Sequence, residues 1–111
     1  MPRRHWIQLP TRVRHAIETH TGRVRSATSA TTGSVSDLAA TLHTDHGTVF
    51  CKAIETTNPH VRMHRNEARL NPWLPDTVPR LRWTVEESGW LALGFDHIPG
   101  RHPDLTVGSP T

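Results

Sequence analysis

The chain has 111 residues, enough for one domain with a modest core, and its hydrophobic content of 34% is low for a globular domain. No apolar run approaches the roughly 18 residues that would span a bilayer, so we expect no membrane association. The net charge of +3 comes from arginines scattered along the chain rather than gathered on one element, which argues against a nucleic-acid-binding protein.

The N-terminal residues and the cysteine content bear on localisation. Residues 1–6 contain two arginines, but no apolar segment follows them, so the sequence predicts no signal peptide. Cys51 has no second cysteine with which to form an internal disulfide, which fits a reducing compartment. We therefore expect a cytoplasmic protein.

The pattern of apolar residues and turn signals predicts seven elements. In chain order they are a short helix, three strands, a longer helix and two strands, over residues 12–18, 23–27, 37–44, 48–54, 58–70, 79–85 and 90–95. For the first helix, Thr11 is the expected N-cap and Gly22 the expected stop. Residues 45–47 read as a turn that joins two strands into a hairpin.

Proline and glycine mark the boundaries in the second half. Asn58 and Pro59 predict the start of the long helix, since asparagine caps helices and proline suits the first turn. Asn71 precedes a proline, which disfavours helical geometry there. Residues 86–89 read as a hairpin turn. After Ile98 the composition shifts to Pro, Gly, Ser and Thr, which is typical of a linker.

These elements predict an α+β fold. Short hairpin connections favour a mostly antiparallel sheet of about five strands, with one long helix packed on it and a short helix at the N-terminus. We assign residues 1–98 to a single lobe and residues 99–111 to a linker tail.

Lys52 is the lone lysine among 13 basic residues, and it lies inside an apolar strand. Alternation places Phe50, Lys52 and Ile54 on one face of the sheet. A lysine in such a strand must reach water or meet an anion, and its compact ammonium suits a phosphate oxygen. The alternative is an edge-strand lysine that points to solvent.

Glu67 interrupts an apolar stripe on the long helix. Met63, Glu67 and Leu70 fall on one helical face, which Leu74 would extend, and a carboxylate that faces a core needs a cation. We therefore predict an ion pair between Lys52 and Glu67. The alternative is that the buried face is the one with Val61 and Ala68, and that Glu67 lies outside, beside Arg62 or Arg65.

Three segments resemble a known family. VFCKA (49–53), RNEA (65–68) and LPDTVPRL (74–81) are similar to the third strand, helix C and following loop of aminoglycoside phosphotransferases, small-molecule relatives of protein kinases. The resemblance implies a kinase-like amino-terminal lobe. It also implies that Lys52 contacts the phosphates of a nucleotide and that Glu67 holds Lys52 in place.

The resemblance extends to a phosphate-binding loop and a hinge. The segment around Gly33 matches the reduced, serine-bearing loop of these enzymes, and residues 90–100 match the fifth strand and hinge, where adenine binds. Ala39 or Ala40 would help to form the walls of the adenine site. The implied nucleotide-binding residues are Lys52, Glu67, Gly33, Ser34, Ser36, Ala53, Leu93, Phe95, Asp96, His97 and Ile98.

The resemblance covers essentially the whole chain but only the front part of the family. The family's catalytic aspartate and magnesium ligands lie in a carboxyl-terminal lobe, and neither His-x-Asp triplet here, at residues 43–45 and 102–104, is placed to replace them. The expected cofactor is ATP with magnesium, but we expect no catalytic residue and no metal ligand in this chain. We also expect no phosphate transfer by the chain alone, and an uncovered apolar face around Phe95 where the second lobe or a partner chain would pack.

Two other functions are compatible with the sequence. A degenerate kinase-like lobe can serve as a non-catalytic interaction module, and a small basic protein can use the helix over residues 61–70 to bind DNA, although the two hairpins argue against the latter. His60 and His64 have the i, i+4 spacing of a zinc pair, but no third ligand lies near them in the sequence.

Overall fold

A five-stranded antiparallel sheet organises the chain, as seen in a computed structural model that describes residues 5–29, 36–75 and 77–97. The strands are β1 (Val24–Ser29), β2 (Leu38–Thr44), β3 (Gly47–Glu55), β4 (Leu81–Glu87) and β5 (Trp90–Asp96). Their order across the sheet is β1-β2-β3-β5-β4, and every neighbouring pair is antiparallel. The predicted α+β class with a five-stranded antiparallel sheet is confirmed.

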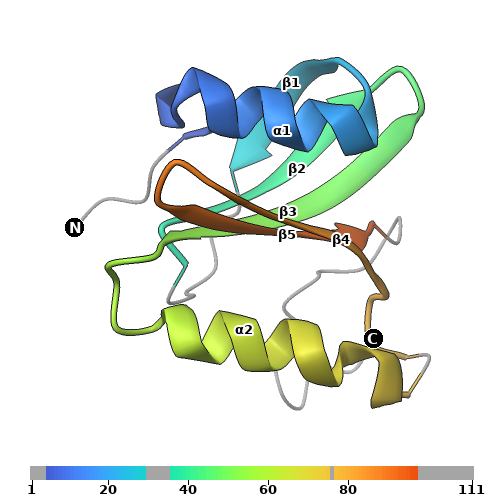
Figure 1. Cartoon of the computed structure of the whole chain (residues 1–111). Helices are drawn as coiled ribbons and strands as arrows, with labels where there is room; N and C mark the ends of the chain where they lie inside the picture. The colour runs from blue at the N-terminus through green and yellow to red at the C-terminus, as the bar shows by residue number, and fades with distance from the viewer. Residues whose placement is uncertain (1–4, 30–35, 76, 98–111) are drawn as a thin grey trace.

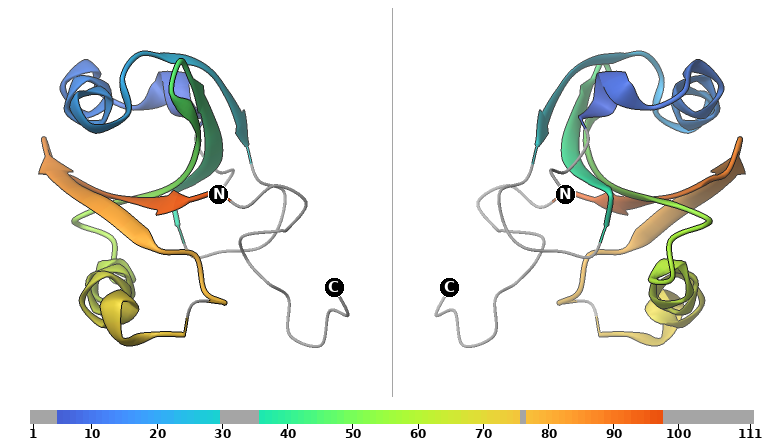
Figure 2. Two further views of the ribbon diagram at one scale, coloured as in Figure 1. Left: turned by 90° about the vertical axis from the view of Figure 1, so that its right-hand side faces the viewer. Right: turned by 90° about the vertical axis from the view of Figure 1, so that its left-hand side faces the viewer.

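Helices cover both faces of this sheet (Figure 1). The 3-10 turn η1 (Trp6–Gln8) and helix α1 (Thr11–Thr21) lie on one face, while α2 (Val61–Leu70), extended by the 3-10 turn η2 (Asn71–Trp73), lies on the other. Figure 2 shows that the sheet curves around α1. Within the described residues, neither helix has the length and apolarity needed to cross a membrane.

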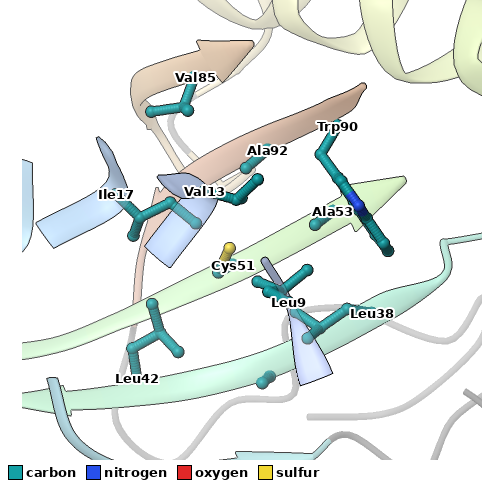
Figure 3. Packing of buried hydrophobic residues seen from close by; sticks show 11 residues of the cluster. Leu9, Val13, Ile17, Leu38, Leu42, Cys51, Ala53, Val85, Trp90 and Ala92 are labelled. Atoms are coloured by element: carbon teal, nitrogen blue, oxygen red, sulfur yellow. The ribbon is translucent and has the colours of Figure 1, made fainter. Parts of the chain in front are cut away.

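The larger core lies between α1 and the sheet (Figure 3). Helix α1 contributes Val13 and Ile17, both fully buried, and Leu9 precedes the helix on the same side. The strands contribute the side chains that alternation turns toward α1, which are Leu38, Ala40, Leu42, Cys51, Ala53, Val85, Trp90 and Ala92. Burial of each large aliphatic side chain contributes about 2 kcal/mol to folding, so this cluster is the main source of stability.

The face of α2 that packs on the sheet is not the predicted one. Val61 and Ala68 contact the second core cluster, whereas Met63 and Leu70 are exposed and Leu74 lies beyond the helix. The remaining members of that cluster are Ala39, Phe50, Ile54, Leu91, Leu93, Phe95 and Leu81. Small Ala68 lets the helix lie close to the sheet, and this contact outweighs the hydrophobicity of the larger stripe.

The helix starts also differ from the predictions. Pro10, not Thr11, is the N-cap of α1, and Gly22 ends that helix with φ 79° as predicted. Helix α2 begins at Val61, after His60. The Asn58 side chain instead accepts a hydrogen bond from the His60 backbone N–H at 2.9 Å, a local turn that competes with the helix.

The two hairpin turns lie close to the predicted positions. Residues 45–46 form the turn between β2 and β3, as predicted. The β4–β5 turn is shorter than the predicted 86–89 segment, because only Ser88 and Gly89 leave the strands. Both have positive φ, 50° and 81°, as a two-residue turn that matches the twist of its strands requires.

Candidate functional site

Lys52 and Glu67 form an ion pair that joins the sheet to α2. The Lys52 ammonium lies 3.0 Å from Glu67 Oε2 and 3.4 Å from Oε1. Their side chains are 23% and 34% exposed, so the pair is partly screened from water but still accessible to a ligand. The predicted pairing is confirmed. Arg65, the alternative partner, binds Glu86 on β4 through two hydrogen bonds of 2.8 and 3.0 Å.

The position of this pair follows from the helix register. Glu67 lies at the edge of the packed face of α2 rather than in an apolar stripe, because Val61 and Ala68 face the sheet. From that edge a glutamate can reach Lys52 on β3 while about a third of its side chain stays exposed. The sequence interpretation therefore had the right pair for the wrong reason.

Register places Lys52 in a row of three residues across the centre of the sheet. Ala39 on β2 and Leu93 on β5 are its direct neighbours on either side. The Lys52 ammonium also lies 5.5 Å from the centre of the Phe95 ring, within range of a cation–π interaction. The lysine is thus held by a carboxylate and an aromatic ring above an apolar surface.

Two of the predicted adenine-wall residues lie on the opposite face of the sheet. Ala53 and Ala40 belong to the cluster under α1, because successive residues of a strand alternate between faces. We exclude both from the candidate site. Ala39, the other β2 residue considered, lies on the same face as Lys52.

Phe95 and Leu93 lie near Lys52 but are covered. Phe95 is 3% exposed and Leu93 is fully buried, so in this conformation neither offers an open surface to an adenine ring. The expected uncovered apolar face around Phe95 is therefore wrong. The exposed large apolar side chains of the described part of the chain are Ile7, Met63, Leu70, Trp73 and Leu74.

The predicted hinge begins at the end of β5. The Asp96 carboxylate forms an ion pair with Arg82, with 2.9 Å between Oδ1 and Nε, and its backbone N–H binds the Arg80 carbonyl, so this N–H is not available to a base. The His97 ring contacts the Thr48 hydroxyl at 3.0 Å. Ile98 and the linker tail lie outside the described residues, as do Gly33 and Ser34 of the predicted loop.

Ser36, predicted to contact phosphate, instead binds α2. Its hydroxyl lies 2.7 Å from Nε2 of His64, and both residues are buried. Nδ1 of His64 faces the His60 carbonyl at 3.3 Å. A carbonyl can only accept, so Nδ1 carries the proton and Nε2 accepts the hydrogen bond from Ser36. His64 was considered only as a partner of His60 in a metal pair.

Burial sets the titration of His64. His64 is only 3% exposed, and this burial lowers its pKa below the usual 6.5. The His60 carbonyl and the Glu67 carboxylate oppose the shift. Both ring nitrogens already have partners within the chain. Among the described residues, no group of three or more His, Cys, Asp or Glu side chains could hold a metal ion.

Asp37 anchors the start of β2 next to Ser36. Its carboxylate accepts a hydrogen bond from the Glu55 backbone N–H at 2.9 Å and lies 3.4 Å from the Asn58 amide nitrogen. These contacts tie β2 to the connection between β3 and α2. No short sequence motif predicts them, because the partners are 18 and 21 residues apart.

We expect the stability of the fold to decrease as the pH falls below about 6.5. The folded-state pKa of His64 is depressed, so on acidification the unfolded chain takes up this proton first and is stabilised relative to the native state. The contribution of neutral His64 to stability is fully present above the unfolded pKa and is lost as the pH falls toward the folded pKa. Over that range the free energy of unfolding changes by at most about 1.4 kcal/mol per pH unit for one proton.

The measurement is urea unfolding followed by circular dichroism over a pH series. His64→Gln should flatten the acid limb, whereas His60→Gln, at an exposed position on the same segment, should leave it unchanged. An identical acid limb in His64→Gln and the wild type would contradict the assignment.

Comparisons with protein-family models, with curated proteins and with solved structures found no match.

Proposed function

We propose that this chain binds ATP as the nucleotide-binding lobe of a small-molecule phosphotransferase of the aminoglycoside phosphotransferase type. The observation that carries the proposal is the partly exposed pair of Lys52 and Glu67, 3.0 Å apart, between β3 and α2. The resemblance implies these residues, and the fold brings them together from positions 15 residues apart.

The chemistry of the pair suits a phosphate. An ammonium has three donors, and Glu67 occupies one side of it, so donors remain for phosphate oxygens. Glu67 also holds the Lys52 ammonium in one position, which is how a binding residue is preorganised. Ala39 and Phe95 lie beside Lys52 on the same face of the sheet, but they are only 2% and 3% exposed. An adenine ring could therefore reach them only if the side chains that cover them moved aside.

Magnesium is expected to arrive bound to the nucleotide. In the part of the chain that the structure describes, no group of three or more His, Cys, Asp or Glu side chains could hold a metal ion, and Glu67 is paired with Lys52. When bound to the nucleotide, the ion would neutralise phosphate charge. Lys52 would do so from the side of the sheet.

We expect Lys52→Ala to weaken binding of magnesium-ATP by at least about ten-fold, the effect of losing one charged hydrogen-bond donor. Binding of magnesium-ATP to the wild type should be weak, with a dissociation constant on the order of millimolar. A titration of the ¹⁵N-labelled chain followed by NMR measures both, and the shifted amides should cluster around Lys52 and Leu93.

Arg62→Ala is the matched control, because Arg62 is an exposed cation on the outer side of α2. It should leave the affinity unchanged. Equal losses in Lys52→Ala and Arg62→Ala would mean that ATP is held only by general positive charge, and the proposal would fail.

A non-catalytic interaction module is the second candidate. The observation that favours it is the set of exposed apolar residues at the end of α2, where Trp73 is 84% exposed, Leu74 follows it directly and Leu70 precedes it by three residues. Exposed apolar residues that gather into one patch commonly mark contact surfaces. The two functions are separated by the ATP titration, since the module requires no nucleotide.

A further inference from the structure

Helix α2 makes two buried or half-buried polar contacts with the sheet and the segment just before β2, and the two contacts are about one helical turn apart. Glu67 binds Lys52, and His64, three residues earlier, binds Ser36. Three residues of α-helix correspond to a rise of about 4.5 Å, so both contacts report on the same short segment of the helix.

We propose that Ser36 and His64 form a positioning latch that sets the orientation of α2, and thereby the alignment of Glu67 with Lys52. Its effect on ligand binding rests on the proposed nucleotide-binding function. Its structural part does not, since it concerns only the helix and the start of β2.

The latch is directional, whereas the apolar packing of the helix is not. Val61 and Ala68 contact the sheet through apolar surface, which tolerates small rotations of the helix. A 2.7 Å hydrogen bond in a buried site does not, because its geometry is narrow and an unpaired buried group is costly. Ser36–His64 therefore fixes the rotation of α2 together with Lys52–Glu67 and the more exposed contact of Arg65 with Glu86.

The sheet end of the latch is itself anchored. Ser36 immediately precedes Asp37, whose carboxylate binds the Glu55 backbone N–H at the end of β3. A displacement of α2 would thus be resisted by β2 and β3 together. The same contact ties α2 to Ser36, the last residue of the predicted phosphate-binding loop over residues 32–36.

The latch is strongest with a neutral His64. Protonation would turn Nε2 into a donor, so the Ser36 hydroxyl would have to rotate and accept from it instead of donating. It would also place a cation in a buried site that faces Lys52 on β3, with Glu67 on α2 and Asp37 beside Ser36 as the opposing carboxylates, and with the His60 carbonyl at Nδ1. Acid pH should therefore loosen α2.

The experiment compares Ser36→Ala, His64→Ala and His64→Gln in the full chain. A glutamine oxygen can take the place of Nε2 as acceptor but does not titrate. At neutral pH, Ser36→Ala and His64→Ala should weaken magnesium-ATP binding by about five-fold, which corresponds to one neutral hydrogen bond, and His64→Gln should restore most of it. On acidification, affinity should fall in the wild type and less steeply in His64→Gln. Titration of the nucleotide itself is common to both proteins.

Two measurements without nucleotide test the latch by itself. Side-chain ¹⁵N shifts of His64 should show protonated Nδ1 and unprotonated Nε2 at neutral pH, and amide hydrogen exchange in α2 should quicken in Ser36→Ala but not in His60→Gln. Unchanged α2 exchange in Ser36→Ala would overturn the latch even if ATP binds, whereas a proton on Nε2 would reverse the direction of the hydrogen bond and overturn the expected loss of the contact in acid. If Lys52→Ala binds ATP as the wild type does while these two results hold, the latch stands and the proposed function fails. Parallel acid limbs of affinity in the wild type and His64→Gln would show that His64 is structural only.

Discussion

Replacement of Gly94 by alanine is expected to lower the free energy of unfolding by about 3 kcal/mol, at the upper end of what overpacking costs. Gly94 lies in β5, paired with Trp83 on the edge strand β4, and its face of the sheet turns toward α1. A methyl group there would lie 2.6 Å or less from the Cδ2, Cε2 and Cζ2 atoms of the Trp83 ring.

The Trp83 ring has little room to retreat from such a methyl group. On its other side the His20 ring of α1 stacks on it, with ring centres 5.4 Å apart and planes 11° from parallel. Gly94→Ala must therefore separate α1 from β4 or displace the ring into solvent. The glycine is required here for close approach, not for its backbone angle, since no positive φ is found at this position.

Chemical denaturation followed by circular dichroism measures the effect. In a Trp83→Val background the space of the ring is empty, so Gly94→Ala should cost less than about 1 kcal/mol, and the cycle should show strong coupling. If the substitution costs the same in both backgrounds, the ring contact is not the cause.

The strands could be predicted because their signals are local. Apolar runs with turn residues between them, such as Asp45 and His46 or Ser88 and Gly89, specify hairpins without reference to the rest of the chain. The face of α2 that packs on the sheet could not be predicted in this way, because the helix sequence offers two competing apolar faces. Met63 and Leu70 are more hydrophobic, but Val61 and Ala68 fit the sheet.

The candidate site was predictable only in part for a similar reason. A charged residue inside an apolar strand marked Lys52, and strand alternation, applied strictly, would have excluded Ala53. The contact between Ser36 and His64 joins residues 28 apart and depends on which way α2 faces. Pairs of this kind emerge from tertiary packing and leave no mark in a local pattern.

Asn71 is a second residue whose role emerges only in the fold. It precedes Pro72, which disfavours helical geometry, yet its φ of −52° and ψ of −44° are helical. Its side chain explains this, because Nδ2 donates to the Pro79 carbonyl at 2.9 Å and Oδ1 accepts from the Leu81 N–H at 2.7 Å. Asn71 is 4% exposed, so these bonds close the connection between α2 and β4 in a buried site.

Asn71→Ala should accordingly destabilise the fold by about 3 kcal/mol. It leaves the Pro79 carbonyl and the Leu81 N–H without their partner, and each such group costs about 1–3 kcal/mol when it is buried and unpaired. Asn71→Asp at neutral pH should cost a similar amount, because it keeps the acceptor for Leu81 but turns a second oxygen toward the Pro79 carbonyl. Asn66→Ala is the control: Asn66 is exposed on the same helix, and its loss should change stability by less than about 0.5 kcal/mol. Urea denaturation of the three variants measures these differences. If Asn71→Ala were as mild as Asn66→Ala, water would have to satisfy the two backbone groups. The two hydrogen bonds of the Asn71 side chain would then contribute nothing to the position of α2.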